Sequence, residues 1–350
     1  MTISITLSGA GTTRKEGDEL PFNTPLIEAK KIYKSYPVGR GMFRAGTEAI
    51  HALNGINLAL EKGETLGLVG ESGCGKSTFG RVLVRLENGY EGKVYYEGAD
   101  VTTLKKEALK GFRRKVQVVF QDPFSSLNPR MRVGAIVREP LDIHHIGSRQ
   151  ERKERMYELL NLVGLRKDHV KRYPHEFSGG QRQRIGLARA LSLNPDLIVC
   201  DEPVSALDVS IQAQVLNLFL ELQEKLNLTY LFISHDLHVV QFISDRVAVM
   251  YLGKIFEIAP KDALYREPLS PYTQALLAAS PVPDPEKERP VIRLEGEMPD
   301  PIHLPSGCLF HPRCPNRKEI CKELPPALVE VEPRHFVRCF LHHDVPEESA

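Results

Sequence analysis

The chain has 350 residues, of which 42% are hydrophobic, and it carries 46 basic and 45 acidic side chains. That length allows one large domain with an added module, or two domains. The net charge of +1 gives no support to nucleic-acid binding driven by bulk charge. No apolar run reaches the ~20 residues of a membrane-spanning helix, and residues 1–10 lack the features of a signal peptide. We therefore expect a cytoplasmic protein whose six cysteines are thiols or metal ligands, not disulfides.

The first part of the chain has the pattern of an antiparallel β structure. Residues 1–24 lack periodicity, and we expect them to form a loose tail. Apolar and polar residues alternate in Leu26–Tyr36 and Ile50–Leu60, which predicts two antiparallel strands on either side of the glycine-rich stretch Gly39–Gly41. A further hairpin is expected through Lys93–Tyr96.

The middle of the chain has the pattern of an α/β core. Buried strands are predicted at 65–69, 116–120, 197–200 and 230–233, and helices at 149–165, 178–193 and 209–226. Strands that alternate with helices indicate a parallel sheet with helices on both faces. A terminal pair of short strands is expected over Arg246–Ile258. From about Pro260 the sheet signals fade and proline and cysteine become frequent, so the predicted units are 1–24, 25–260 and 261–350.

A phosphate-binding motif follows the predicted strand at 65–69. It reads Gly70-Glu71-Ser72-Gly73-Cys74-Gly75-Lys76-Ser77-Thr78. Its glycines let backbone N–H groups and a helix N-terminus converge on phosphate oxygens. Lys76 would reach the β- and γ-phosphates and the Ser77 hydroxyl would hold Mg²⁺. The alternative is a glycine- and serine-rich turn with a stray lysine, but the full pattern arises by chance in roughly 1% of such chains. We therefore predict a nucleotide site.

Two acidic residues end the buried strand at 197–200. In phosphate-loop enzymes a carboxylate at this place steadies Mg²⁺, usually through water, and we assign that role to Asp201. The next residue, Glu202, is expected to polarise the water that attacks the γ-phosphate. Two adjacent acids in a turn are common, and the preceding apolar strand gives this pair its significance.

The segment Phe177-Ser178-Gly179-Gly180-Gln181 resembles the signature sequence of ATP-binding cassette (ABC) proteins, which normally begins with leucine. Ser-Gly-Gly at a helix start is a second anion cradle, although a capped helix without a ligand has the same pattern. The resemblance implies that this cradle faces the γ-phosphate held by a partner subunit. It also implies an ABC ATPase core of the P-loop α/β class with an N-terminal antiparallel β subdomain, a helical subdomain at about 124–180 and a cysteine-rich C-terminal extension.

The same resemblance assigns further positions. Gln121 matches the glutamine that senses nucleotide and joins the Mg²⁺ ligands, and His235 matches the histidine that contacts the γ-phosphate and positions water. Tyr36 lies where the family has an aromatic residue that stacks on adenine, with Tyr33 as the alternative. The loop that crosses the dimer interface is matched by Ser205, Ala206, Leu207 and Asp208.

Finer similarity points to the ATPase subunits of bacterial dipeptide and oligopeptide permeases, in particular the F-type. It is carried by Gln121–Pro129, Glu202–Asp208, Ser270–Leu277, Gly307-Cys308, and Tyr36–Val38 with Gly41–Phe43. The similarity implies ATP hydrolysis that drives peptide import, by a hetero-pair with a second, unlike ATPase beneath two transmembrane permease subunits. An extracytoplasmic peptide-binding protein would feed them, and the chain would lie peripherally on the cytoplasmic face of the inner membrane. Import of nickel or another peptide-like substrate, a small-molecule kinase and a nucleotide-gated regulatory module are the alternatives.

Four cysteines cluster near the end of the sequence, at Cys308, Cys314, Cys321 and Cys339. Their spacing lacks the Cys-x₂₋₄-Cys pairs of common zinc sites, whereas a [4Fe–4S] cluster needs four thiolates and tolerates varied spacing. Related peptide-importer ATPases carry such a cluster in this region, so the resemblance implies one here. Buried structural thiols and zinc remain alternatives. Cys74 and Cys200 are not expected to be ligands, but Cys74 is expected to make the ATPase sensitive to thiol reagents.

Overall fold

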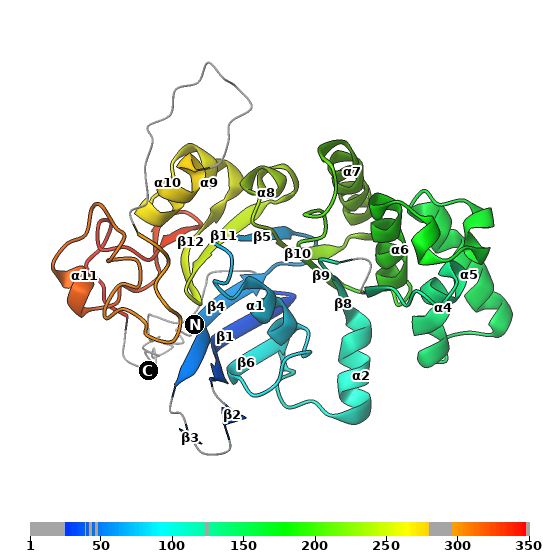
Figure 1. Ribbon diagram of the computed structural model, residues 1–350, viewed down its shortest axis with the longest axis horizontal. Coiled ribbons are helices and arrows are strands. Elements are labelled where there is room, and N and C mark those ends of the chain that lie inside the picture. The colour runs from blue at the N-terminus through cyan, green and yellow to red at the C-terminus, as the bar shows by residue number, and fades with distance from the viewer. Residues whose placement is uncertain are drawn as a thin grey trace, which may run out of the picture.

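The computed structural model describes residues 25–279, with gaps at 39, 42–43, 46–47 and 123–125, and residues 296–347. The predicted loose tail at 1–24 therefore lies outside the described residues. Figure 1 shows a main sheet with helices on both sides, a smaller antiparallel sheet beneath it, a group of helices at one end and the C-terminal segment at the other.

The smaller sheet has the strand order β4-β1-β6-β7. Its strands are β1 (Ile27–Pro37), β4 (Ala49–Leu60), β6 (Glu91–Tyr96) and β7 (Ala99–Asp100). β1 pairs antiparallel with both β4 and β6, which confirms the strands predicted from alternation. Between β1 and β4 the short strands β2 (Arg40–Gly41) and β3 (Arg44–Ala45) pair with each other.

The main sheet has the order β13-β14-β12-β11-β5-β10-β9-β8. Its strands are β5 (Thr65–Val69), β8 (Val116–Val119), β9 (Leu197–Asp201), β10 (Thr229–Ile233), β11 (Arg246–Tyr251), β12 (Lys254–Pro260), β13 (Val329–Glu332) and β14 (His335–Val337). The five strands from β11 to β8 are parallel. Four of them, β5, β8, β9 and β10, are the strands predicted for a parallel sheet, and β11 was expected only as part of a terminal pair of strands. β5, β9 and β10 are buried at every position, which explains why their sequences are continuously apolar.

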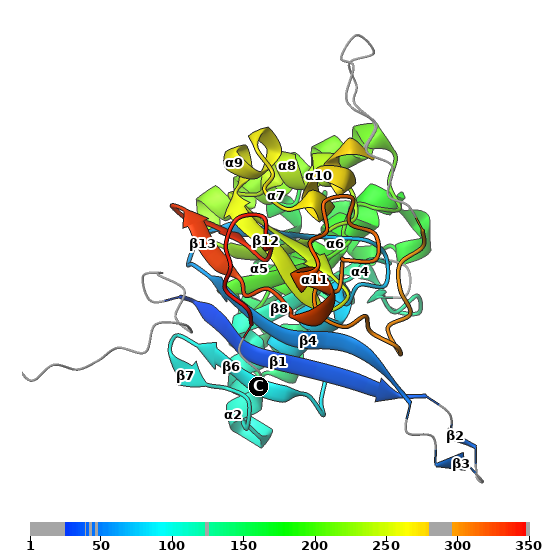
Figure 2. The same ribbon diagram turned by 90° about the vertical axis from the view of Figure 1, so that its left-hand side faces the viewer.

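The expectation that the sheet ends with Arg246–Ile258 is wrong. β14 pairs antiparallel with β12, and β13 extends the sheet by one more strand. The carboxylate of Glu257 on β12 lies 2.7 Å from the ring of His335 on β14, and both side chains are buried. β13 has four residues and β14 three, neither has the three apolar residues of β8, and both lie where proline is frequent, so no strand was predicted there. Figure 2 shows α10 (Pro271–Ala278), α11 (Ile320–Glu323) and β13 gathered around β12.

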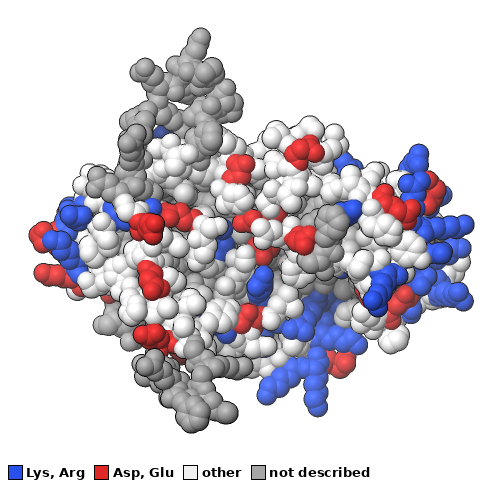
Figure 3. All heavy atoms as spheres, viewed as in Figure 1, with Lys and Arg blue, Asp and Glu red and all other residues white. Residues whose placement is uncertain are grey.

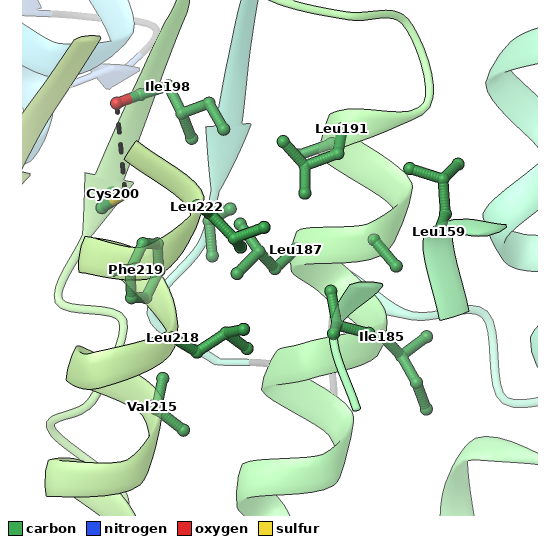
Figure 4. Close-up of a cluster of buried hydrophobic side chains, with 14 of the residues drawn as sticks. Leu159, Ile185, Leu187, Leu191, Ile198, Cys200, Val215, Leu218, Phe219 and Leu222 are labelled. Carbon is green, nitrogen blue, oxygen red and sulfur yellow. Dashed lines mark hydrogen bonds between the residues drawn. The ribbon is translucent and has the colours of Figure 1, made fainter. Parts of the chain in front are cut away.

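Helices cover the sheet and form the group at one end. They are α1 (Lys76–Leu83), α2 (Lys106–Lys115), α4 (Val133–Ile143), α5 (Arg149–Leu162), α6 (Gly179–Leu191), α7 (Val209–Leu226), α8 (Leu237–Ile243), α9 (Lys261–Arg266) and the 3₁₀ turns η1 (Lys167–Lys171) and η2 (Pro174–Glu176). In Figure 4, Leu187 and Leu191 of α6 face Leu218 and Leu222 of α7. This buried cluster joins the helical group to the sheet.

The surface carries both signs of charge. Figure 3 shows basic side chains gathered over α2, whose last turn contains Arg113, Arg114 and Lys115, and over the helical group. Within the described ranges, no helix combines the length and the apolar character that crossing a membrane requires.

Candidate active site

The predicted phosphate-binding motif forms the loop between β5 and α1. Gly75 precedes α1 with φ of 106°, and a Cβ atom there would lie 2.3 Å from the carbonyl oxygen of Ala52. A Cβ atom at Gly70 would lie 2.1 Å from the carbonyl oxygen of Met250. Both positions need glycine because the backbone is packed against other backbone. The loop therefore presents the N-terminus of α1, which favours anions.

Lys76 lies over the loop itself. Its Nζ donates hydrogen bonds to the carbonyl oxygens of Gly70 and Glu71, at 2.8 and 3.0 Å, and the residue is only 5% exposed. The ammonium group is thus held at the loop by neutral acceptors that a phosphate group can replace.

Ser77 and Asp201 form the pair of oxygen donors expected for Mg²⁺. The Ser77 Oγ donates to Asp201 Oδ1 at 2.6 Å, and Asp201 is buried at the end of β9. A hydroxyl and a carboxylate are ligands that suit Mg²⁺. Within the described ranges, however, no three His, Cys, Asp or Glu side chains lie close enough to hold a metal ion. The third predicted ligand, Gln121, instead donates from Nε2 to Glu202 Oε2 at 2.8 Å.

Glu202 lies between two predicted site residues. Its Oε2 accepts the hydrogen bond from Gln121, and its Oε1 lies 3.2 Å from Nδ1 of His235. Its backbone has φ of 48°, and its N–H donates to the carbonyl oxygen of Ile233 at 3.0 Å. A non-glycine residue in the left-handed region is strained, and such strain concentrates at functional sites. The structure thus brings Gln121, Glu202 and His235 together.

The two candidate tyrosines for stacking on adenine lie in different places: Tyr36 lies beside the phosphate-binding motif, and Tyr33 lies against Gly55. The pKa of Tyr36 is raised, mainly by burial and then by the charge of Glu87, and Thr78 at the end of the phosphate-binding motif also acts on it. The Tyr33 hydroxyl oxygen instead packs against Gly55, because a Cβ atom built on Gly55 would lie only 2.7 Å from it. Of the two candidates, Tyr36 is therefore the one beside the loop.

The signature segment caps α6. Ser178 Oγ accepts from the N–H of Gln181 at 3.4 Å, and Gln181 Oε1 accepts from the N–H of Ser178 at 3.2 Å. Neighbouring side chains leave no room at the two glycines: a Cβ atom at Gly179 would lie 2.9 Å from Leu207 of the loop before α7, and one at Gly180 would lie 2.3 Å from Ile211 of α7. α6 packs against β8, which is separated from β5 by β9 and β10. The two predicted phosphate cradles of one chain are thus apart.

The predicted dimer loop links Glu202 to α7. Ser205 Oγ donates to the carbonyl oxygen of Glu202 at 3.1 Å. Asp208 caps α7 by accepting from the N–H of Ile211 at 3.1 Å, and this bond lowers the pKa of Asp208. Ala206 and Leu207 lie between them, and Val209, directly after the loop, is 82% exposed.

The four cysteines of the C-terminal segment line one cavity. Cys308, Cys314, Cys321 and Cys339 share it with Phe256, Phe310, Phe340 and other residues. Burial raises the pKa of Cys308 to about 12 and that of Cys339 to about 11, and the neighbouring cysteines add to both shifts. Sulfur is the donor that an iron–sulfur cluster takes, but among the described residues no three of these thiols lie close enough together to hold a metal ion, so the structure does not support the expected cluster.

Sequence reasoning missed two residues at the phosphate loop. Arg313 contacts the carboxylate of Glu71 at 2.9 Å, and the Tyr272 hydroxyl accepts the N–H of Glu71 at 3.1 Å. Arg313 is 242 positions away in the chain and belongs to no motif. Tyr272 belongs to the stretch Ser270–Leu277 that carries the permease resemblance, but nothing in that stretch indicated a contact with Glu71.

The chain is similar to known transport ATPases over most of its length. The family described as ABC transporter matches residues 53–205, and the family described as oligopeptide/dipeptide transporter, C-terminal region, matches residues 256–321. The oligopeptide transport ATP-binding protein AppF of Bacillus subtilis is 54% identical over 322 residues, which cover 91% of this chain and 97% of AppF. The dipeptide transport ATP-binding protein DppF of Escherichia coli is 49% identical over 322 residues, 92% of this chain and 96% of DppF.

A solved structure shares the fold. It is a dimeric ATP-binding cassette in a post-hydrolysis state bound to ADP and Pi, with a TM-score of 0.60 and 31% identity, and the match covers 67% of this chain and 98% of that chain. Together with the phosphate loop and the relatives above, this confirms the predicted ABC ATPase fold. The chain belongs to the ABC transporter ATPases, and among them to the ATP-binding proteins of oligopeptide and dipeptide transporters.

Proposed function

We propose that this chain hydrolyses ATP and couples the reaction to the import of dipeptides or oligopeptides. The observation that carries the proposal is the position of Glu202, held between Gln121 and His235 beside the Ser77–Asp201 pair. The peptide substrate is supported by the names of the relatives, which are oligopeptide and dipeptide transport ATP-binding proteins.

The residues take different roles in the hydrolysis. Lys76 and the N–H groups of the loop bind the β- and γ-phosphates, and Tyr36 stacks on the base. Ser77 and Asp201, with Gln121, would hold Mg²⁺, which supplies neutralisation of the phosphate charge. Glu202 accepts a proton from the attacking water and His235 orients that water toward the γ-phosphate. The protein thus works by positioning and electrostatics.

The second half of each site comes from another chain in this proposal. The Ser178–Gln181 cradle begins α6, which packs against β8, and two strands, β9 and β10, separate β8 from the β5 strand that leads into the phosphate loop of the same chain. The exposed Val209 follows the Ser205–Asp208 loop. We place a second, unlike ATPase opposite these surfaces, two permease subunits above the pair and an extracytoplasmic peptide-binding protein beyond them. The chain would then lie on the cytoplasmic face of the membrane through its contacts with the permeases.

We also propose the division of the chain into a cassette at 25–260, with a helical subdomain at about 124–180, and an extension at 261–350. The extension would hold a [4Fe–4S] cluster on its four cysteines, because all four side chains line one cavity. When bound, the cluster would brace the extension, since ATP hydrolysis needs no electrons. Anaerobic purification followed by iron and sulfide analysis tests this. Iron-free protein that is folded and active would contradict it.

The function itself is tested in the assembled complex. The chain is purified with its membrane partners, reconstituted with the binding protein, and assayed for ATP hydrolysis with and without peptide. We expect peptide to stimulate hydrolysis, and a complex with Lys76→Ala to be inactive. Stimulation by nickel and not by peptide would show that the imported substrate is nickel and not a peptide. A phosphorylated small-molecule product would indicate a kinase, and ATP binding without turnover would indicate a regulatory module.

A further inference from the structure

We infer that Arg313 and Tyr272, two residues of the C-terminal extension, are positioning residues that hold the phosphate loop and set its affinity for ATP. The inference rests on the proposed function, because it concerns the same nucleotide site. The inference gives the C-terminal extension a role in the ATP site of the same chain.

Arg313 holds the side chain of the second loop residue. Its Nη1 donates to both carboxylate oxygens of Glu71, at 2.9 and 3.0 Å, and to the hydroxyl of Tyr251 at 3.3 Å. The Arg313 side chain is 8% exposed and that of Glu71 is 25% exposed. A charged hydrogen bond shielded in this way is stronger than an exposed surface pair. The guanidinium group therefore fixes where the Glu71 carboxylate lies.

Tyr272 holds the backbone of the same loop residue. This tyrosine of α10 is fully buried; its hydroxyl accepts the N–H of Glu71 at 3.1 Å and donates to the carbonyl oxygen of Met250 at 3.4 Å. The same carbonyl oxygen is the atom packed against Gly70. One hydroxyl group thus ties the start of the phosphate loop to β11.

These contacts bear directly on phosphate binding. Glu71 places a negative charge in a loop that must receive a polyanion, and Arg313 neutralises it. Lys76 donates to the carbonyl oxygens of Gly70 and Glu71, so the orientation of these two residues also determines where its ammonium group lies. Without Arg313 the loop would carry an unpaired carboxylate and would lose one of the supports for Lys76. Both effects weaken ATP binding.

The contacts continue into the extension. The rings of Tyr251, Tyr272 and Phe310 pack together, with centroids 4.7 to 5.5 Å apart. Phe310 lines the cavity of the four cysteines, and Arg313 directly precedes Cys314. The packing of the extension and the geometry of the phosphate loop are thus physically continuous. Because coupling between sites is reciprocal, ATP binding would in turn stabilise this arrangement of the extension.

The experiment is a double-mutant cycle on the full chain, with ATP affinity measured by titration with a fluorescent ATP analogue and competition by ATP. We expect Arg313→Gln to weaken ATP binding by about tenfold, with kcat at saturating ATP nearly unchanged. Glu71→Gln in the same chain is expected to restore most of the affinity, because it removes the unpaired charge. Tyr272→Phe, which removes only the hydroxyl group, is expected to weaken binding in the same direction.

The matched control is Arg334→Gln. Arg334 also joins the extension to the cassette, with Nη2 2.8 Å from Glu61 Oε1, but this contact is away from the phosphate loop. We expect the Arg334→Gln variant to bind ATP with unchanged affinity. Wild-type affinity in Arg313→Gln, or an Arg313→Gln/Glu71→Gln chain as weak as Arg313→Gln alone, would overturn the inference. A wild-type chain that binds no ATP would instead overturn the proposed function.

Discussion

Ser77 and Asp201 are 124 positions apart in the chain, yet their side chains are joined by a hydrogen bond of 2.6 Å. The contact exists because β5 and β9 lie on either side of β10 and run parallel to it, so that the chain leaves all three at the same edge of the sheet. Glu202 follows β9 and His235 follows β10 in the chain, so both residues also lie at that edge. Parallel topology alone therefore collects these side chains beside the phosphate loop.

Replacing Ser77 by alanine tests the proposed Mg²⁺ ligands. The change removes one oxygen donor and leaves Asp201 without its hydrogen-bond partner, so we expect the Mg²⁺ concentration for half-maximal ATPase activity to rise by at least about tenfold. A magnesium titration of ATPase activity measures this, and chelation by EDTA should abolish activity in both proteins. Ser35→Ala, which removes a 3.1 Å contact with His51 at an exposed position, is the control. An unchanged magnesium requirement would remove Ser77 from the ligand set.

Replacing Glu202 by glutamine tests the proposed base. Glutamine keeps the size and can still hydrogen bond with Gln121 or His235, but it cannot accept a proton from water. We expect kcat to fall by about 10² to 10⁴ while ATP binding is retained and the closed pair of ATPases accumulates. Hydrolysis is measured by phosphate release and association by size-exclusion chromatography with ATP. Glu224→Gln, on the exposed surface of α7, is the control, and hydrolysis at an undiminished rate would refute the assignment.

The central strands and helices were predictable because the buried strands are continuously apolar and the helices have apolar residues at helical spacing. Thr65–Val69 and Val209–Leu226 are found with the predicted bounds. The helix expected at 149–165 ends at Leu162 because Gly164, with φ of 72°, stops it. β14 was not predictable, since three residues carry no pattern and its pairing with β12 is decided by tertiary contacts.

Some residues of the candidate site were also predictable from the sequence, and others were not. Residues that follow buried strands, such as Asp201 and His235, could be identified because a strand end fixes where they lie. The contact between Arg313 and Glu71 could not, because it depends on how the extension folds back over the loop. A long-range ion pair leaves no local signal in a single sequence.

Thiol labelling tests the environment of Cys74. The residue is 1% exposed, and burial raises its pKa, although the nearby Lys76 acts in the opposite direction. A raised pKa means that less thiolate is present at neutral pH than in a free thiol, and the fraction grows as the pH rises. We therefore expect N-ethylmaleimide to modify Cys74 slowly near pH 7 and faster at higher pH, despite the sensitivity expected from its place in the loop. Mass spectrometry measures the modification.

The control for this labelling is the same chain in guanidinium chloride, where all six cysteines should react quickly. Protection of Cys74 by ATP would place the thiol beneath the bound nucleotide. Labelling of the folded chain as fast as that of the unfolded chain would show that Cys74 is open to solvent, contrary to the packing described above.

Two glycines of α6 allow a matched test of the signature helix. A Cβ atom at Gly180 would lie 2.3 Å from Cγ2 of Ile211, whereas a Cβ atom at Gly186 would meet nothing within 4 Å. Alanine at Gly180 must therefore push α6 and α7 apart, and we expect it to destabilise the chain by about 1–3 kcal/mol. Alanine at Gly186 gains helix propensity without a clash, and we expect it to stabilise the chain by up to about 1 kcal/mol. Urea unfolding followed by circular dichroism measures both.

The opposite signs decide the interpretation. If both variants stabilise the chain, helix propensity dominates and the close packing of Gly180 on Ile211 is refuted. If Gly180→Ala alone is destabilised, its ATPase activity should fall as well, because Ser178 and Gln181 begin the same helix and move with it. Gly186→Ala should keep full activity, since its position is seven residues further along α6 than the signature's Gly179 and its added methyl group displaces no neighbour.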